Sequence, residues 1–223
     1  MMQADACAIA LHEGASVSGL WMCPAQPHAT YVFAHGAGAG MQHAFMAALA
    51  GDLAEAGVAT LRFQFPYMER GSKRVDSPAV AHAAVRAAVE AARKRAPAIP
   101  LYAGGKSFGG RMTSQAQAGT PLEGVRGLAF VGFPLHPAGK PSRDRATHLA
   151  QVNIPMLFLA GTRDELADLE LLRPVTAELG ERATLVTFDE ADHAFHVPAR
   201  TGRRDPDLRM EMARIMADWM RSV

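Results

Sequence analysis

Gly105-Lys106-Ser107-Phe108-Gly109 stands between a short apolar run at 99–103 and a segment at 111–118 whose composition is typical of a helix. The order strand, Gly-x-Ser-x-Gly, helix is the context that a nucleophile elbow requires. Glycines on both sides let the strand and the helix approach closely while the serine adopts a strained backbone conformation. The pattern therefore predicts that the hydroxyl of Ser107 projects above the edge of a sheet as a nucleophile.

Two other interpretations of this stretch exist. Gly105-Lys106-Ser107 also closes a phosphate-binding Walker A motif, but that motif requires a glycine five positions earlier, where Pro100 stands. The sequence therefore disfavours a nucleotide-binding loop. A Gly-rich turn that carries an ordinary surface serine is the simpler alternative, and only the flanking strand and helix argue against it.

Composition limits the class of protein. The chain has 223 residues, with 23 Lys and Arg against 22 Asp and Glu. This near-neutral balance gives no electrostatic reason to expect nucleic acid or an anionic membrane as a partner. No apolar run approaches the roughly 20 residues that span a bilayer. Hydrophobic residues make up 49% of the chain, and no repeat or linker divides it, so we expect a single domain over 1–223 with a sizeable core.

The N-terminal residues and the cysteines point to a location. The first residues lack the basic and apolar regions of a signal peptide, and Cys7 and Cys23 are the only cysteines. We expect both to be reduced thiols of a cytoplasmic protein rather than a disulfide.

Apolar runs alternate with helix-like segments along most of the chain. A hairpin is predicted at 8–11 and 17–21, with its turn at His12-Glu13-Gly14. Further strands are predicted at 31–34, 59–63, 101–104, 127–131, 156–160 and 184–188, and helices at about 45–56, 77–96, 165–179 and 205–219. Uniformly apolar strands are typical of a parallel sheet covered by helices on both faces. In such α/β folds the functional residues gather beyond the carboxyl ends of the strands.

A serine nucleophile needs a base, and His193 is the best candidate. It lies just past the last predicted strand and fits the chain order serine, acid, histidine. His196 is close by and remains an alternative. The two could also form a His-x-x-His metal site, but no second cluster of ligands accompanies them, so we expect no metal.

The histidine in turn needs a carboxylate, which holds its tautomer and stabilises its cation. Asp164 is the first carboxylate after the strand at 156–160. Asp168, Asp189 and Asp192 are rivals for this role. Asp164 could instead cap a helix that begins near Glu165, and the two roles are compatible.

Donors for a developing oxyanion are expected from two places. His35-Gly36-Ala37-Gly38-Ala39-Gly40 follows the strand at 31–34, and this turn can aim the backbone N–H of Ala37 at the space above Ser107. The N–H of Phe108 is the second expected donor. We expect His35 to brace the loop by hydrogen bonds.

Taken together, these segments resemble the alpha/beta-hydrolase superfamily over residues 31–219. A narrower resemblance rests on four stretches: 35–40, 63–67, 104–111 and 134–141. They are similar to a small branch named after a testis-expressed protein and a subunit of a histone-acetyltransferase complex, whose bacterial members are often called dienelactone-hydrolase-like. The resemblance implies a Ser-His-Asp hydrolase with no metal and no organic cofactor, and it implies no particular substrate. Dienelactone hydrolases proper use a cysteine nucleophile, so Ser107 argues against that reaction.

The sequence therefore predicts an alpha/beta-hydrolase fold, with a mostly parallel twisted sheet and helices on both faces. The protein is expected to cleave a small carboxylic ester or thioester. Five residues that follow strand ends are expected to shape the substrate pocket, with ordinary core packing as the alternative: Phe65, Tyr67, Phe133, Leu135 and Leu166. Two other functions stay open, a non-catalytic binding protein or complex subunit with this fold, and an acyltransferase that uses the same triad. The oligomeric state is not predicted.

The segment at 132–155 bears on the size of the substrate. It holds Pro134, Pro137 and Pro141, which rule out a long helix in its first part, and only a short helix is possible at about 143–149. We therefore expect no large lid and a preference for short acyl groups.

Overall fold

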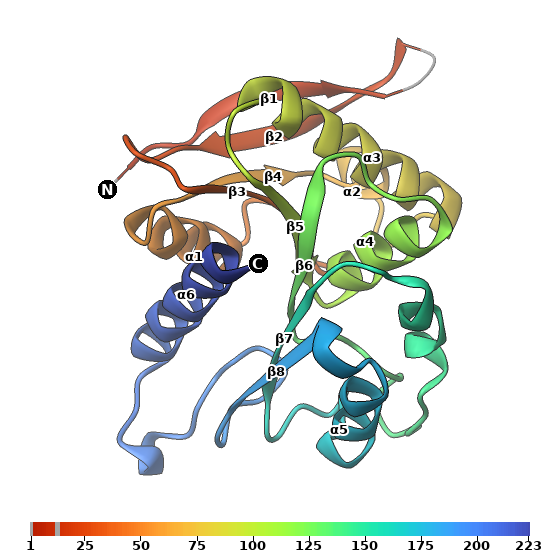
Figure 1. Cartoon of the computed structure of the whole chain (residues 1–223), viewed down its shortest axis with the longest axis vertical. Helices are drawn as coiled ribbons and strands as arrows, with labels where there is room; N and C mark the ends of the chain where they lie inside the picture. The colour runs from red at the N-terminus through yellow and green to blue at the C-terminus, as the bar shows by residue number, and fades with distance from the viewer. Residues whose placement is uncertain (1, 12–13) are drawn as a thin grey trace.

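The apolar runs form the strands of one eight-stranded sheet in the computed structural model, which describes residues 2–11 and 14–223 (Figure 1). The strands are β1 (Asp5–Ala10), β2 (Ser16–Met22), β3 (Ala29–Ala34), β4 (Val58–Phe63), β5 (Leu101–Lys106), β6 (Val125–Val131), β7 (Met156–Gly161) and β8 (Ala183–Phe188), in the spatial order β1-β2-β4-β3-β5-β6-β7-β8. β1 and β2 pair antiparallel, β2 pairs antiparallel with β4, and all other neighbours are parallel. The predicted mostly parallel sheet is confirmed. Residues 12 and 13 of the predicted hairpin turn lie outside the described residues.

Helices cover both faces of this sheet. Figure 1 shows α1 (Ala44–Glu55) and α6 (Asp205–Ser222) side by side on one face, and α3 (Pro78–Arg95) and α4 (Phe108–Gly119) on the other. α5 (Leu169–Glu178) packs into the same core as α3 and α4. The two faces of the sheet thus bury separate apolar clusters, and this is why the central strands are buried at nearly every position and are mostly apolar.

α3 shows how the sequence specifies one of these helices. Ser77 precedes it and Pro78 occupies its first turn, where the missing N–H of proline costs nothing. The residues that it buries recur at three- and four-residue intervals and are all Ala or Val: Ala81, Ala84, Val85, Ala88, Val89 and Ala92. Small side chains allow the helix to lie close to the sheet and to α4.

The connection between β6 and β7 contains turns and the 3₁₀ helix η2 (Asp144–Gln151), close to the short helix expected at 143–149. It therefore contributes no large lid, as predicted. Other short elements are α2 (Pro66–Glu69), η3 (Gly180–Arg182) and η4 (Ala199–Thr201). Within the described residues, the helices are all too short or too polar to cross a bilayer.

The junction between β5 and α4 is packed so closely that it tolerates only glycine at position 109. A Cβ atom on Gly109 would lie 2.5 Å from the carbonyl oxygen of Ala34 and 2.6 Å from that of His35. Both are backbone atoms at the end of β3, so they cannot move aside without shifting the strand. Gly119, at the other end of α4, has no atom within 4 Å of the same position.

We therefore expect Gly109→Ala to destabilise the fold, whereas Gly119→Ala serves as the matched control. Overpacking of this kind costs about 1–3 kcal/mol, while alanine is a better helix former than glycine at the open site. Urea unfolding of both variants measures the difference. Equal free energies of unfolding for the two variants would contradict the close packing described for the elbow.

Candidate active site

Ser107 occupies a strained turn between β5 and α4. Its backbone angles are φ 50° and ψ −115°, in the region that side chains other than glycine avoid. Such a conformation costs on the order of 1–3 kcal/mol and persists only where its surroundings impose it. Here the N–H of Ser107 donates to the carbonyl of Val131 at 3.1 Å, and the carbonyl of Ser107 accepts the N–H of Arg111 at 3.1 Å. The two hydrogen bonds fix the turn to β6 and to the first turn of α4.

The side chains of Ser107, His193 and Asp164 form a continuous hydrogen-bonded chain. The Oγ of Ser107 lies 2.9 Å from Nε2 of His193, and Nδ1 of His193 lies 2.9 and 2.8 Å from the two carboxylate oxygens of Asp164. The carboxylate is fully buried, whereas the imidazole is 25% exposed. These are the distances at which a base activates a nucleophile. The structure thus brings together the three residues that the sequence singled out.

The partners of the imidazole fix its tautomer. A carboxylate only accepts hydrogen bonds, so Nδ1 of His193 carries the proton toward Asp164 and Nε2 is free to accept the hydroxyl of Ser107. Oδ1 of Asp164 also accepts the backbone N–H of Leu166 at 2.8 Å, which holds the carboxylate in place. A neutral imidazole with its free nitrogen toward the serine is the arrangement that general-base chemistry requires.

His196, the alternative base, takes no part in this hydrogen-bonded chain. Its Nδ1 bonds to Asp205 at 2.8 Å, and its side chain is 64% exposed. The two histidines therefore bond to different carboxylates. In the described part of the chain, no group of three or more His, Cys, Asp or Glu is arranged to hold a metal ion.

The rival acids have other partners. Asp168 accepts the N–H of Glu170 and caps α5, so the helix cap considered for Asp164 belongs to Asp168 instead. This difference arises because α5 begins at Leu169 rather than near Glu165. Asp189 accepts the hydroxyl of Thr162, and Asp192 accepts two backbone N–H groups of its own loop.

A second serine–histidine hydrogen bond joins Ser114 and His148. Their side chains are 2.7 Å apart, but Ser114 is fully buried in the middle of α4 and also donates to the carbonyl of Arg111. Burial, with the charges of Arg111 and His82, lowers the pKa of His148 to about 4, so the ring is neutral. Among the described residues no carboxylate bonds to His148. This pair therefore resembles a buried structural contact between α4 and η2 rather than a reactive site.

The glycine-rich loop after β3 lies against the elbow, as predicted. Nδ1 of His35 bonds to the carbonyl of Gly36 at 2.8 Å, and Nε2 accepts the N–H of Phe65 at 3.0 Å. Since Nε2 accepts the hydrogen bond from Phe65, it carries no proton, and the ring is neutral with its proton on Nδ1 toward the carbonyl of Gly36. Burial also lowers the pKa of His35. His35 therefore braces the loop by hydrogen bonds in the manner expected from the sequence.

Two backbone N–H groups are available near Ser107. The N–H of Phe108 is the first of α4, and that of Ala37 lies in the loop whose Gly36 would place a Cβ 3.8 Å from Cβ of Ser107. Within the described residues neither group donates to a protein acceptor. Unsatisfied N–H groups at a helix start attract a developing negative charge.

A cavity of about 310 Å³ opens above Ser107 and His193. Its polar members also include Lys106 and His43, and the rest of its wall is apolar and small to medium in size: Ala37, Ala39, Phe45, Met46, Leu166 and Ala194. Four of these lining residues were not predicted from the sequence: Lys106, His43, Phe45 and Met46. Phe45 and Met46 directly follow the glycine-rich loop at the same edge of the sheet, and this position was the one available signal.

Of the five residues expected to shape the pocket, only Leu166 lines this cavity. Phe65, Tyr67, Phe133 and Leu135 are at most 1% exposed and belong to the core on the α3 and α4 face, so ordinary packing holds for these four. The turn of α2 brings Tyr67 and Phe65 under Phe108, with ring centroids 6.4 and 5.3 Å from it. These rings turn into the core because burial of a large aromatic surface is favourable. A position directly after a strand does not indicate this direction.

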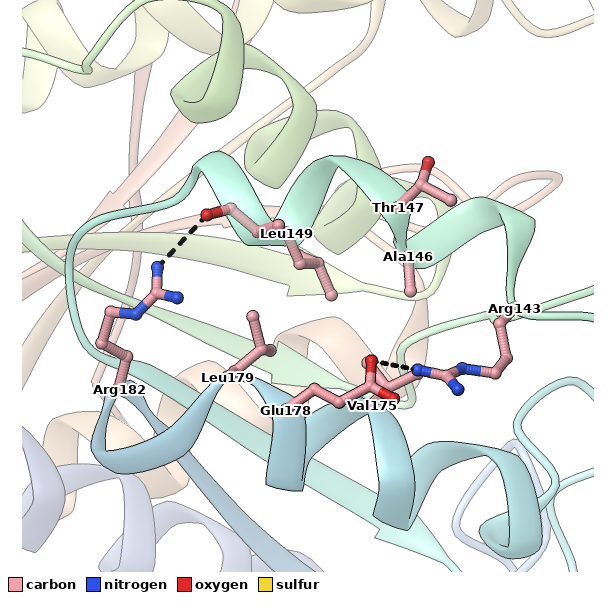
Figure 2. Close-up of a pocket in the computed structure, with 9 residues that line it drawn as sticks. Arg143, Ala146, Thr147, Leu149, Val175, Glu178, Leu179 and Arg182 are labelled. Atoms are coloured by element: carbon pink, nitrogen blue, oxygen red, sulfur yellow. Dashed lines mark hydrogen bonds and ion pairs between the residues drawn. The ribbon is translucent and has the colours of Figure 1, made fainter.

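Another cavity, of about 450 Å³, lies between η2 and α5 (Figure 2). An ion pair between Arg143 and Glu178 closes one end, and Leu149 and Leu179 face one another across it. It contains none of the three hydrogen-bonded residues. Ser107 and His193 instead line the cavity described above.

The family of the chain follows from comparison with known proteins. A family model described as an alpha/beta hydrolase domain matches residues 27–221, so the chain belongs to the alpha/beta hydrolase family. This confirms the resemblance predicted from the sequence.

Solved structures share the fold along almost the whole chain. A dienelactone hydrolase from Anabaena variabilis has a TM-score of 0.78 at 20% identity, covering 99% of this chain and 98% of its own. An alpha/beta serine hydrolase without a lid from Xanthomonas campestris has a TM-score of 0.74 at 23% identity, covering 95% and 93%. Est1E from Butyrivibrio proteoclasticus has a TM-score of 0.73 at 17% identity, covering 98% and 99%. At these identities the comparison shows a common fold.

Proposed function

We propose that this protein is a serine hydrolase that cleaves small carboxylic esters or thioesters through an acyl-enzyme. The observation that carries the proposal is the hydrogen-bonded chain from Ser107 through His193 to the buried Asp164. Such a chain converts a weakly nucleophilic hydroxyl into a reactive one at neutral pH. Membership in the alpha/beta hydrolase family supports this function.

The proposed reaction begins when Oγ of Ser107 attacks the carbonyl carbon of the substrate and its proton passes to Nε2 of His193. The tetrahedral intermediate then collapses, and the leaving alkoxide or thiolate takes that proton from His193. Water next attacks the acyl-enzyme while His193 again accepts a proton, and the acid is released with the Ser107 hydroxyl restored. Asp164 stays ionised throughout and stabilises the imidazolium.

The backbone N–H groups of Ala37 and Phe108 stabilise the oxyanion in this proposal. Each is free of a protein acceptor among the described residues, and the two approach Ser107 from different elements. Donors fixed before the reaction act most strongly where charge develops, and loss of one costs about 2.7–4 kcal/mol in comparable enzymes.

The shape of the cavity supports a small acyl group. A volume of about 310 Å³ with a largely apolar wall suits a short hydrocarbon chain, and the connection between β6 and β7 adds no lid to extend it. Each methylene buried contributes about 0.8 kcal/mol until the wall is reached. Beyond that length an added carbon lies in water and contributes little.

The first test is covalent labelling of the nucleophile. A fluorophosphonate should add one adduct per chain, located on Ser107 by peptide mass spectrometry, and Ser107→Ala should abolish it. Ser114→Ala is the matched control, because Ser114 also bonds to a histidine, and it should label like the unsubstituted protein. An adduct that survives in Ser107→Ala, or that disappears in Ser114→Ala, would move the nucleophile. A complete lack of reaction would favour the non-catalytic alternative.

The second test is the dependence of kcat/KM on acyl length for p-nitrophenyl esters. We expect kcat/KM to rise by up to about fourfold per methylene from acetate and to level off by about six carbons. Phe45→Ala should enlarge the cavity and move the optimum to longer chains, because Phe45 forms part of its wall. A steady rise to twelve or more carbons would show that the cavity does not bind the acyl chain.

A further inference from the structure

Lys106 directly precedes Ser107, yet its side chain reaches the loop after β8 that carries His193. We call residues 189–198 the histidine loop. Its Nζ donates a hydrogen bond to the backbone carbonyl of His193 at 2.5 Å. The same Nζ lies 5.4 Å from the centre of the Phe195 ring, within the range of a cation–π contact. One side chain of the elbow therefore contacts two residues of the loop that carries the proposed base.

The partly buried side chain of Lys106 lines the cavity above Ser107, and its ammonium group has no direct acidic partner among the described residues. Among the described residues no carboxylate comes within 4 Å of it, although Asp164 and Asp192 are near enough to influence its charge. A Cβ on Gly132, at the end of β6, would lie 3.1 Å from Nζ and 3.3 Å from Cε1 of His193. Glycine at this position thus leaves room for both groups to lie above β6.

This environment changes the protonation of the lysine. Burial lowers the pKa of Lys106 to about 8, and the negative charges of Asp164 and Asp192 act in the opposite direction. At neutral pH the group is therefore mostly protonated and positively charged.

The histidine loop needs to be held. Glu190 and Phe195 both have positive φ, 59° and 63°, although neither is glycine. Each such conformation costs on the order of 1–3 kcal/mol, so contacts around the loop must offset this strain. The hydrogen bond and the cation–π contact from Lys106 act on the segment between these two residues.

We propose that Lys106 is a positioning residue for His193, which keeps its Nε2 within reach of Ser107 and opposes protonation of the imidazole at mildly acidic pH. This inference rests on the proposed serine hydrolase function. A shift of a base by about 1 Å costs roughly 100-fold in rate, so fixing the carbonyl of His193 matters for turnover. The positive charge of Lys106 disfavours a second positive charge on the imidazole, so it extends the pH range in which the base is neutral toward lower pH.

The charged groups around His193 determine the direction in which the pH dependence of the rate should shift when Lys106 is replaced. Asp164 bonds to its Nδ1 and favours the imidazolium, and Asp192 adds a negative charge from the same loop. His43 lies across the cavity as the N-cap of α1. Arg163 and Arg200 pair with Glu190 near the start of the loop. Lys106 is the cation that bonds to His193 itself, and its removal takes away the positive charge beside the base. The imidazole then stays protonated to higher pH.

The experiment measures the rate of fluorophosphonate labelling and the hydrolysis of p-nitrophenyl acetate between pH 5 and 9 in three variants. Lys106→Met keeps the length of the side chain but removes donor and charge, and Lys106→Gln keeps a donor without the charge. Lys94→Met is the control, because Lys94 is 74% exposed on α3. Thermal unfolding reports whether each variant is folded.

We expect Lys106→Met to lower kcat by about 10- to 100-fold with KM changed less than about threefold. The acidic limb of its pH–rate profile, where the rate rises with pH, should move to higher pH by about half a unit to one unit. Lys106→Gln should recover part of kcat but keep the displaced limb, and Lys94→Met should match the unsubstituted protein. If Lys106→Met does not fold, the position of the acidic limb in the pH–rate profile of Lys106→Gln tests the inference instead.

Two results would overturn the inference. Unchanged labelling and an unmoved limb in both Lys106 variants would show that the lysine plays no part. An equal loss of rate at every pH with an unmoved limb would show a merely structural contact. If the unsubstituted protein itself fails to label, the proposed function fails and the inference falls with it, so the two failures are distinguishable.

Discussion

The backbone conformation of Ser107 is the constraint on which the site depends. With φ 50° the chain turns from β5 into α4 within one residue, so the serine hydroxyl stands above the sheet and the first N–H of α4 lies beside it. The conformation survives because Gly109 allows α4 to approach the backbone of β3, and because the N–H of Ser107 bonds to Val131. Strain at one residue is thus offset by packing over three neighbouring strands.

The order of the strands sets the second constraint. Ser107 follows β5 and Asp164 follows β7, and β6 separates the two strands. Two strand spacings amount to about 10 Å, too far for a serine and an aspartate to meet. The imidazole of His193 spans this gap from the loop after β8, and Gly132 at the end of β6 leaves the space beneath it. The chain order serine, acid, histidine is therefore a consequence of strand order.

The sequence predicts the features whose signal is local. The elbow, the uniformly apolar strands and the first carboxylate after β7 are all readable from neighbouring residues, and the positions of Ser107, Asp164 and His193 followed from them. The sequence does not predict the direction of a side chain where that direction depends on packing against distant residues. Phe65 and Tyr67 follow a strand end as an active-site residue would, yet their rings turn into the core under Phe108. The reach of Lys106 to the histidine loop had no sequence signal, because 87 residues separate the two partners.

The measurement that tests the central claim most directly is the turnover of Asp164→Asn beside that of Asp168→Asn. Asparagine keeps the shape of Asp164 but lets the imidazole bind as the wrong tautomer, so kcat should fall by up to about 10⁴-fold with little change in thermal unfolding. Asp168 caps α5, where asparagine is an equally good cap, so its variant should keep full activity. Unchanged turnover in Asp164→Asn, with loss of turnover in Asp168→Asn, would contradict the account.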